Sequence, residues 1–470
     1  MRKRKLHIKR YLTLLVGGCS TVALAQVTVN LPRANIQNRT DYQQTIAAGQ
    51  YTSLLGLLPT FSVRSNTPNF TNLLAGTETA PLNLAYIKMV SVGSVSLVNV
   101  ASEVALSTGY QQIYASLVSL LSGPVTVNLR LRTANHRWLA GAYTGQLGFL
   151  APGLLGVGNQ INPPTQDITI NVPGFIAPPA TVGNTQIAVN NLSYYRGVSG
   201  IAVNKSIAMS TTVPYQPTLQ SGATSFNFST TVPYNQLPSS PVGTVSVGLT
   251  GIVNASPITL STAVQGLTTT AGIAVPPTNN QTLTAVFSIS GANLKSSFVQ
   301  AGTYNVPITY AWNKLASAYP ATPIQESRTG SVDIVVSDLG ELVANQNAVP
   351  LVFASTGDYQ QGVIKDMPAH LRISKTTPYN LYVRAASSSF ASGTNTIPLS
   401  VLRIGPMPGE SGMNTVTLSA TPQQLINAAN PVIDRNLNVR YTIPASEVGQ
   451  IMGKPAGVYS VNVVFSFVAP

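Results

Sequence analysis

The chain has 470 residues, which suits about three domains of ordinary size. Only 8% of the residues are charged, while 37 are Gly and 33 are Pro, a composition that favours strands and turns over long amphipathic helices. The net charge is +13 for the whole chain but +7 without residues 1–25, with 20 basic residues against 13 acidic ones, and it does not indicate nucleic-acid binding.

Residues 1–25 are predicted to be a signal peptide. Basic residues between Arg2 and Arg10 precede an apolar stretch, and Ala23-Leu24-Ala25 fits the small-x-small rule for cleavage. The mature chain would then begin at Gln26 and contain no cysteine. The alternative is a lipobox at Val16-Gly17-Gly18-Cys19, in which Cys19, the only cysteine of the chain, is lipidated and anchors the protein.

The next segment alternates apolar and polar residues and recurs further along. Val27-Thr-Val-Asn-Leu-Pro32 is matched by Ile168-Thr-Ile-Asn-Val-Pro173 and more loosely by Ile334-Val-Val-Ser-Asp-Leu339. Successive side chains of a strand point to opposite faces, so each copy is predicted to be a strand with one buried face.

Several other blocks recur in constant order, which indicates a tandem of three homologous modules. One block has the pattern Val/Ile-x-Leu-Ser-x-x-x-Gln-x-Ile/Leu, and an alternating apolar run follows each of its copies. Copies of that pattern are Val104–Ile113, Ile258–Leu267 and Val416–Leu425, and the alternating runs after them are 125–131, 283–289 and 437–443. A further block is shared by Phe226–Asn235 and Leu371–Asn380, with a less similar copy at Phe61–Phe70.

The clearest repeat closes each module. Ala140–Phe149, Ala301–Tyr310 and Ala456–Phe465 share the pattern Ala-Gly-x-Tyr-x-x-x-aliphatic-x-aromatic. The Tyr and the apolar positions after it lie on one face of the predicted strand, and the Gly before the Tyr is expected to admit a turn or bulge.

Two stretches rich in Gly, Pro and small polar residues, 153–166 and 313–330, are predicted to be linkers. The expected modules are then 26–152, 167–312 and 331–470. Short alternating strands separated by turns predict an all-β chain of three tandem immunoglobulin-like β-sandwiches.

The C-terminus carries a further pattern. Gly457 is the fourteenth residue from the end, and an alternating strand follows it with Tyr459, Val461, Val463, Phe465 and Phe467 on one face. In this the chain resembles subunits and adhesins of bacterial chaperone–usher fimbriae. It departs from that family in having three modules rather than one or two, Ala469 as the penultimate residue, and no disulfide.

The resemblance implies incomplete immunoglobulin-like domains and two kinds of site. A periplasmic chaperone or the next subunit would cover the C-terminal strand, formed by Gly457, Tyr459, Val461, Val463, Phe465 and Phe467. An N-terminal strand would fill the groove of another subunit, and Val27, Val29 and Leu31 are the candidate residues of this donor strand.

One hypothesis joins the repeats to this resemblance. If each module lacks its last strand, the opening strand of the next could complete it, Ile168–Val172 for the first module and Ile334–Val336 for the second. The third module would keep an open groove beside Val461–Phe467, and Val27–Leu31 would be a free donor. The alternative is three self-contained sandwiches, whose end strands would show the same alternation.

The sequence offers little for catalysis. His136 and His370 lie at non-equivalent places, and no catalytic motif or calcium loop is present, so we predict no catalytic residue, no metal site and no cofactor. Tyr194, Tyr195 and Arg196 are the one candidate cluster for a glycan or host protein.

The sequence therefore predicts a non-enzymatic structural or adhesive protein of a bacterial surface appendage, assembled by β-strand complementation. We expect export through the periplasm to the cell surface or the medium. The expected partners are a periplasmic chaperone, an outer-membrane usher, other fimbrial subunits or copies of itself, and a glycan or host receptor, but no nucleic acid. The alternative is a self-contained or lipid-anchored surface protein that binds glycan or a host protein.

Overall fold

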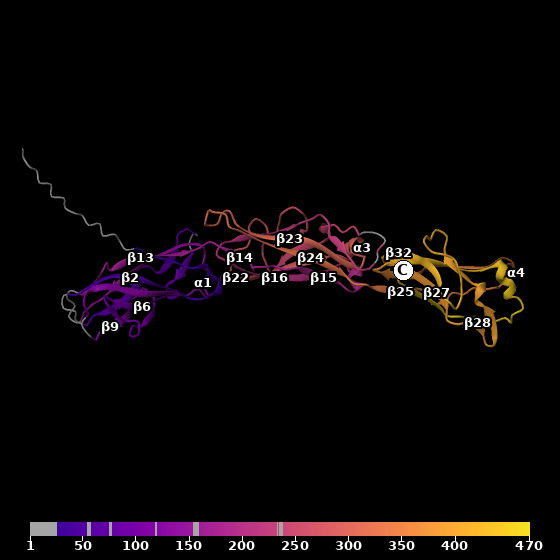
Figure 1. Cartoon of the computed structure of the whole chain (residues 1–470), viewed down its shortest axis with the longest axis horizontal. Coiled ribbons are helices and arrows are strands. Elements are labelled where there is room, and N and C mark those ends of the chain that lie inside the picture. Colours follow the sequence, from indigo (N-terminus) through magenta and orange to yellow (C-terminus); the bar gives the residue numbers. More distant parts are fainter. Residues whose placement is uncertain are drawn as a thin grey trace, which may run out of the picture. The chain divides into compact units, whose positions relative to one another are not determined.

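The computed structural model describes residues 26–470 except 54–57, 75–77, 118–119, 154–158, 233 and 235–237. The predicted signal peptide and Cys19 lie outside the described residues. The described chain consists mostly of short and medium-length strands with a few helical turns, which confirms the predicted all-β class (Figure 1). None of its helices in this part of the chain is long and apolar enough to cross a membrane.

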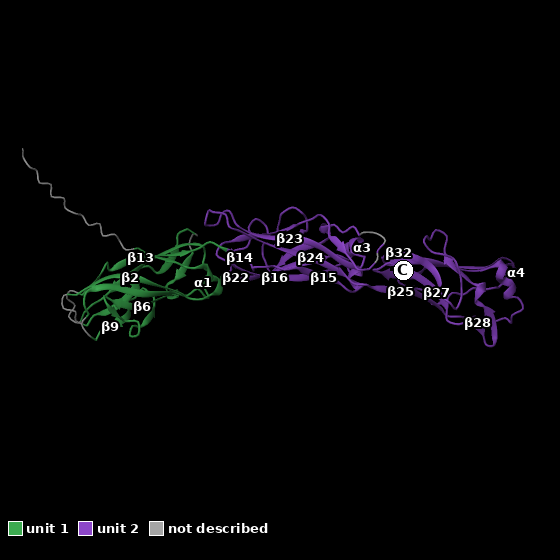
Figure 2. Ribbon diagram, viewed as in Figure 1, with its two compact units in different colours: residues 1–175, 277–279 green, residues 176–276, 280–470 purple. Residues whose placement is uncertain are grey.

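Strand pairing follows three successive stretches of the chain, named here module 1 (β1–β13), module 2 (β14–β24) and module 3 (β25–β34). The contacts divide the chain differently, into two compact units (Figure 2). Residues 1–175 with 277–279 form one unit, and residues 176–276 with 280–470 form the other. Modules 2 and 3 therefore belong to a single compact unit.

Module 1 is a sandwich of a seven-stranded and a six-stranded sheet. The first has the order β1-β13-β11-β3-β9, and β4 and β5 extend it; its strands are β1 (Gln26–Asn30), β13 (Thr165–Val172), β11 (Gly141–Leu150), β3 (Thr60–Ser65), β9 (Gln111–Ala115), β4 (Asn69–Asn72) and β5 (Thr79–Pro81). The second contains β12 (Gln160–Asn162), β2 (Tyr42–Thr52), β10 (Gly123–Leu131), β6 (Ala85–Val92), β7 (Val95–Ser96) and β8 (Glu103–Ala105). Helix α1 (Arg33–Asn38) connects β1 to β2.

Module 2 repeats this arrangement. The sheet equivalent to the first sheet of module 1 has the order β15-β24-β23-β17-β21, with β18 beside β23; its strands are β15 (Thr185–Val189), β24 (Gln325–Val336), β23 (Gly302–Lys314), β17 (Tyr215–Ser221), β21 (Gln265–Gly266) and β18 (Asn227–Ser229). The other sheet contains β14 (Ile176–Ala177), β16 (Ile201–Thr211), β22 (Asn280–Ile289), β19 (Ser246–Thr250) and β20 (Ile258–Thr259). Two short helices, α2 (Ser193–Arg196) and α3 (Gly291–Ser297), complete the module.

Module 3 has one full sheet and one shortened sheet. The full sheet contains β25 (Gly340–Ala344), β26 (Gly362–Lys375), β33 (Val432–Pro444), β30 (Arg403–Pro406) and β31 (Val416–Thr417). The shortened sheet has only three strands, β32 (Gln423–Ala429), β27 (Tyr379–Ala385) and β34 (Val463–Val468). A separate hairpin is formed by β28 (Ser389–Ser392) and β29 (Asn395–Pro398), and helix α4 (Thr356–Gln361) precedes β26.

The closing repeat, Ala-Gly-x-Tyr, marks the start of equivalent strands. The Leu139 N–H donates a hydrogen bond of 3.0 Å to the Tyr143 hydroxyl. The other two tyrosines donate to the carbonyl four residues upstream, from Tyr304 to Gln300 over 2.8 Å and from Tyr459 to Pro455 over 2.9 Å. This is the tyrosine corner of immunoglobulin-like sandwiches, and it explains why the chain repeats the same residues.

The glycine of the repeat is required where the backbone enters the sheet. Gly141 and Gly302 have φ values of 143° and 147°, a region that disfavours residues with a side chain. A Cβ atom at Gly141 would lie 2.4 Å from the Asn72 side chain, and one at Gly302 would lie 2.7 Å from the Ser229 carbonyl oxygen. The predicted turn or bulge therefore corresponds to a close approach of neighbouring atoms at Gly141 and Gly302, whereas a Cβ atom at Gly457 would lie 3.3 Å from its nearest neighbour, Ser392 Oγ.

Candidate functional site: an open sheet edge in module 3

In modules 1 and 2, a strand located after the tyrosine-corner strand in the chain completes the same sheet of that module. In module 1, β13 lies between β11, to which it is antiparallel, and β1, to which it is parallel. In module 2, β24 lies in the same way between β23 and β15. These pairings agree with the hypothesis that the strand opening the next predicted module completes the one before it.

The same pairings correct the predicted boundaries. Modules 2 and 3 were expected to begin at 167 and 331, but β13 and β24 pair within the preceding modules. Strand β24 also begins at Gln325, inside the expected linker 313–330, and β13 begins at Thr165, inside the expected linker 153–166. Alternation reveals a strand but not the sheet that it joins, so the sequence placed both strands one module too late.

Module 3 has no strand in this position within the described residues. Its shortened sheet has the order β32-β27-β34, which corresponds to β9-β3-β11 in module 1 and to β21-β17-β23 in module 2. The two further strands of those sheets, β13 and β1 or β24 and β15, have no counterpart paired to β34. Strand β34 is thus a sheet edge where its equivalents are sheet interiors.

Burial of the apolar side chains shows the consequence. The inward residues of β23 are fully covered: Tyr304, Val306, Ile308, Tyr310 and Trp312 are all at most 2% exposed. Their counterparts in module 3 pack against its core but remain half-buried, and these are Tyr459, Val461, Val463, Phe465 and Phe467. Five predicted residues of the C-terminal strand therefore lie together along one incompletely covered face.

A second apolar segment packs against the same core. Val349, Leu351 and Phe353 alternate along an extended stretch without assigned strand structure, and all three are half-buried against the same core. Chain order identifies this stretch, because β1, α1 and β2 follow one another in module 1 just as 349–353, α4 and β26 do in module 3. The stretch is the counterpart of β1 and β15 without a strand to pair with.

This second segment is not among the predicted site residues, although its pattern is visible in the sequence. Val349-Pro-Leu-Val-Phe353 alternates in the same way as Val27–Leu31. Pro350 and the poor match to the other module openings concealed it. The three half-buried residues of this segment and the five half-buried residues at and before β34 pack against one core, and we name this set the acceptor groove: Val349, Leu351, Phe353, Tyr459, Val461, Val463, Phe465 and Phe467.

The eight residues of the acceptor groove are all uncharged. His370 lies behind it, with its ring 6.2 Å from that of Phe465, and its two ring nitrogens contact the Gln346 side chain and the Tyr441 hydroxyl, each over 2.9 Å. Burial lowers the pKa of His370, so this ring is neutral at pH 7. Such a groove can take one more β-strand, through apolar side chains on one face and backbone hydrogen bonds to the edge of β34.

The predicted donor strand is not free in this structure. Val29 and Leu31 are buried, with 0% and 1% exposure, and Val27 is partly covered. The strand pairs with β13 over Gln26–Asn30. A donor strand and an ordinary first strand need the same alternation, so the sequence could not separate the two roles.

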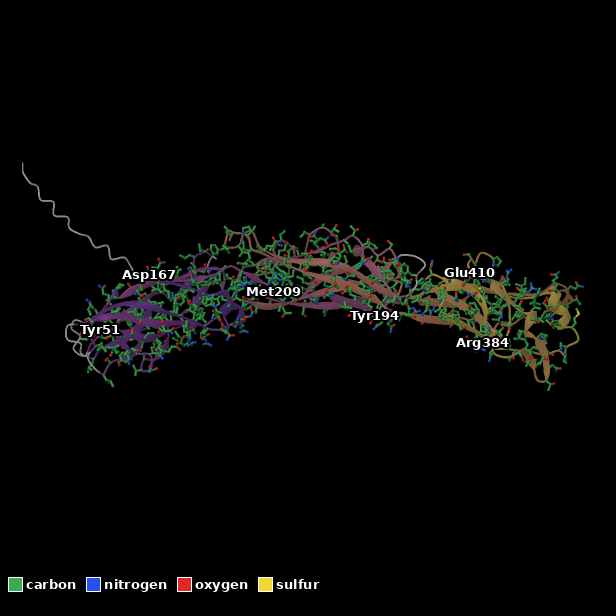
Figure 3. The ribbon with its side chains drawn as sticks, viewed as in Figure 1. Tyr51, Asp167, Tyr194, Met209, Arg384 and Glu410 are labelled. Carbon is green, nitrogen blue, oxygen red and sulfur yellow. The ribbon has the colours of Figure 1, made fainter. Side chains whose placement is uncertain are left out.

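Two residues of the predicted ligand cluster make structural contacts within the chain. Tyr195 is buried and donates a hydrogen bond of 2.8 Å to the Phe298 carbonyl oxygen. Arg196 forms ion pairs with Glu341 and Asp434 of module 3. Tyr194, labelled in Figure 3, is partly exposed and Arg196 is exposed but ion-paired, so the buried Tyr195 is not part of a surface shared by all three residues.

Module 1 has a separate feature, a set of exposed leucines on neighbouring loops. Leu117 and Leu121 are 90% and 87% exposed, and Leu58 and Leu150 are more than one-third exposed. The segments 42–63, 104–129 and 138–166, which contain these residues, have no charged residue. Hydrogen bonds join the loop bases, from Ser116 N to Pro59 O, from Thr60 N to Pro152 O and from Ser53 N to Ser122 Oγ, each over 3.0 Å.

Within the described residues, no group of three or more His, Cys, Asp or Glu side chains could hold a metal ion.

Comparison with known proteins gives structural similarities only. No protein-family model and no curated protein sequence matches the chain. Solved structures similar to it include CfaE, the adhesive subunit of CFA/I fimbria of enterotoxigenic Escherichia coli (10% identity, 66% of this chain and 98% of that chain, TM-score 0.25). A second is the CsuC–CsuE chaperone–tip adhesion subunit complex of Acinetobacter baumannii (14% identity, 62% of this chain and 99% of that chain, TM-score 0.29). A third is the CupB6 tip adhesin of Pseudomonas aeruginosa (10% identity, 63% of this chain and 89% of that chain, TM-score 0.24).

These similar structures are described as fimbrial adhesins or tip subunits. TM-scores this low carry no information on function, which has to be inferred from the acceptor groove and the loops of module 1.

Proposed function

We propose that this protein is a non-enzymatic subunit of a bacterial surface appendage, and that its module 3 is joined to another subunit by a donated β-strand. The observation that carries this proposal is the contrast between buried inward residues on β23 and half-buried ones on β34. Full burial of an exposed side chain contributes roughly 1.5–3 kcal/mol, so completing the burial of five half-buried ones would contribute about half of that each, enough for a long-lived joint.

We further propose that the joint is one-sided. Strands β1, β13 and β24 all pair within the chain, so the described residues contain an acceptor groove but no unpaired donor strand. A subunit that accepts a strand and gives none ends a fibre. This replaces head-to-tail self-polymerisation through Val27–Leu31 as the proposed mode of assembly.

The partners follow from the chemistry of the open edge. An uncovered apolar edge strand pairs readily with other strands and promotes aggregation, so it needs cover before assembly. We propose a periplasmic chaperone as the temporary cover and an outer-membrane usher as the site where a subunit's donor strand replaces it. Export through the periplasm to the cell surface is part of the same proposal.

We propose module 1 as the adhesive part. The exposed leucines at 58, 117, 121 and 150 fit an apolar partner better than a charged one, because the segments that carry them have no charge. Changing Leu117 and Leu121 to Ser should reduce adherence of cells to an apolar surface, whereas Leu73→Ser, at a residue 71% exposed in a different loop, should not. Equal adherence of all three strains would exclude this surface as the adhesive one.

The assembly proposal is tested on the native protein. Surface material is extracted and run on an SDS gel with and without boiling, and the chain is detected by immunoblot. A strand-joined subunit should migrate in high-mass species that boiling converts to a single monomer band. Phe465→Asp should abolish these species because it places a charge in the acceptor groove, while Ser466→Asp, on the exposed face of the same strand, should leave them intact.

A monomer band under both conditions would contradict the proposal. It would favour the alternative of a self-contained surface protein that binds glycan or a host protein, anchored through Cys19 if that residue is lipidated.

A further inference from the structure

Modules 2 and 3 are held together by an ionic cluster built around Arg196. The guanidinium group contacts both oxygens of Glu341, with Nη2–Oε1 at 2.6 Å and Nη1–Oε2 at 3.1 Å. It also donates to Oδ1 of Asp434, from Nη2 over 2.8 Å and from Nε over 3.0 Å. Paired contacts of this kind fix the orientation of both partners as well as their distance.

A second cation from module 2 closes the cluster. Lys295 Nζ lies 3.0 Å from Oδ2 of Asp434, so Arg196 and Lys295 hold the two oxygens of one carboxylate. On the side of module 3, Arg372 lies 3.2 Å from Glu341, and the Ser374 hydroxyl donates to Asp434 over 3.2 Å. The Asp434 carboxylate therefore has partners from both modules: Oδ1 contacts Arg196 and Ser374, and Oδ2 contacts Lys295.

The backbone places these groups with little freedom. Arg196 ends α2 and Lys295 lies in α3, and the two helices approach so closely that a Cβ atom on Gly291 would lie 2.2 Å from the Gly197 carbonyl oxygen. Asp434 has a φ of 57°, and its N–H is bonded to the Ser374 hydroxyl over 3.0 Å. The cations and the carboxylate thus come from rigid positions in their own modules.

The covalent connection between the two modules is short. Strand β24 ends at Val336 and β25 begins at Gly340, which leaves residues 337–339 as the connection. Thr376, at the turn between β26 and β27, accepts a hydrogen bond from the Ala301 N–H of module 2 over 2.7 Å. Its own hydroxyl donates to the Ser337 carbonyl oxygen over 2.8 Å.

The pKa shifts of Asp434 and Glu341 agree with an ion-paired cluster. Partial burial of Asp434 raises the pKa of its carboxyl group, but hydrogen bonds from Arg196 and Lys295 outweigh this and lower the pKa to about 2. The hydrogen bond from Arg196 likewise lowers the pKa of Glu341. Both carboxylates are charged at neutral pH and remain attractive partners for the cations.

We propose that Arg196 and Lys295 form an ionic clasp that makes modules 2 and 3 one rigid body and suppresses a hinge at residues 337–339. The clasp goes beyond strand acceptance. It would fix the direction in which the acceptor groove of module 3 is presented relative to module 2, so that a strand-joined partner cannot swing about this connection.

The chain is suited to a direct test, because its only cysteine is Cys19 in the predicted leader. Cysteines are introduced at two exposed positions, Thr250→Cys in module 2 and Thr417→Cys in module 3, and carry spin labels. Pulsed electron paramagnetic resonance then measures the distance between the modules. A pair at Thr250→Cys and Thr329→Cys, within module 2, serves as the internal reference.

The unmodified clasp should give a narrow distance distribution between the modules. Arg196→Gln combined with Lys295→Gln should at least double its width and leave the reference pair unchanged. The matched control is Arg440→Gln, which breaks a two-bond ion pair with Asp366 inside module 3 and should not widen the distribution. High salt should widen it partly in the parent chain, since the cluster is partly exposed.

A distribution of unchanged width in the double variant would overturn the proposal and assign the rigidity to the backbone contacts alone. If the double variant fails to fold, Glu341→Gln removes the bidentate contact from the side of module 3 and is measured in its place. A wide distribution already present in the parent chain would also overturn the proposal.

Discussion

Phe149 and Phe465 occupy the same position of the same repeat and differ in their neighbours. Phe149, on β11, is 2% exposed because β13 continues the sheet beside it. Phe465, on β34, is half-buried because no described strand of the chain lies on that side. The comparison shows that completeness of a module here depends on the chain that follows it. Module 3 is the one after which the described chain supplies no strand.

The largest expected effect lies in a strand that already completes a module. Ile334 on β24 is 0% exposed, so Ile334→Asp would bury an unpaired charge and should destabilise module 2 by roughly 4 kcal/mol or more. Thr329→Asp, on the exposed face of the same strand, should be nearly neutral. Urea unfolding followed by hydrogen exchange of module 2 measures both. Similar loss from the two variants would show that β24 is not an essential part of that sandwich.

A pair of identical substitutions measures the contrast between the modules directly. Phe149→Ala should cost about 3–5 kcal/mol, because it leaves a cavity in a closed core. Phe465→Ala should cost about half as much in the free chain, since its ring is only partly covered. Unfolding free energies of modules 1 and 3 provide the comparison. Equal costs would mean that module 3 is already closed without a partner.

The connection between modules 2 and 3 should respond to acid. Asp434 has a pKa lowered from 3.8 to about 2, so its charge contributes stability above about pH 4 that is lost as the pH falls toward 2. Hydrogen exchange at the turn carrying Thr376 should therefore increase over this range before the strands of either module exchange. Asp434→Asn should remove this pH dependence, and its persistence in that variant would assign it to another carboxylate.

The smallest expected effect is at the tyrosine corners. Tyr304→Phe removes a buried hydrogen bond and should cost about 1 kcal/mol. Tyr459→Phe removes the equivalent bond, but the hydroxyl in module 3 lies where water can replace it, so the loss should be at most about 0.5 kcal/mol. Thermal melting of the two variants makes the comparison. A larger loss for Tyr459 would contradict the open state of module 3.

Part of this architecture was predictable from the sequence alone. The alternating runs and the three copies of Ala-Gly-x-Tyr predicted sandwiches and placed the open groove beside Val461–Phe467. These signals are local, because a strand carries its pattern wherever it pairs. The Val104–Ile113 block and its copies also cover equivalent consecutive strands, such as β8 and β9 or β31 and β32. At each of these places the chain passes from one sheet to the other.

The rest depends on which strands pair, and a single sequence does not show this. Phe226–Asn235 was matched to Leu371–Asn380 because both end in Pro-Tyr-Asn. In the structure, Leu371–Asn380 spans the end of β26 and the start of β27, whose module 2 counterparts are β16 and β17 at Ser210–Tyr215. The chain contains Ser-Thr-Thr-Val-Pro-Tyr twice, at 210–215 and 229–234, and the first copy is the structural counterpart.

The surroundings of the candidate ligand cluster also depend on the fold. Tyr194, Tyr195 and Arg196 are adjacent in sequence, but the residues that satisfy Arg196 are 145 and 238 positions away, at Glu341 and Asp434. Only the folded arrangement shows that this arginine is committed to the connection between modules 2 and 3.

The central claim is that module 3 lacks one strand, and the most direct measurement supplies that strand. A second copy of residues 315–336, the connection and strand that complete module 2, is added after Pro470, and hydrogen exchange of module 3 is compared with that of the parent chain. The account predicts slower exchange along β34 and at 349–353 and a higher melting temperature for module 3, with no gain when the added copy carries Ile334→Asp. Unchanged exchange with the intact copy would contradict the account and show that the edge of β34 is not an acceptor.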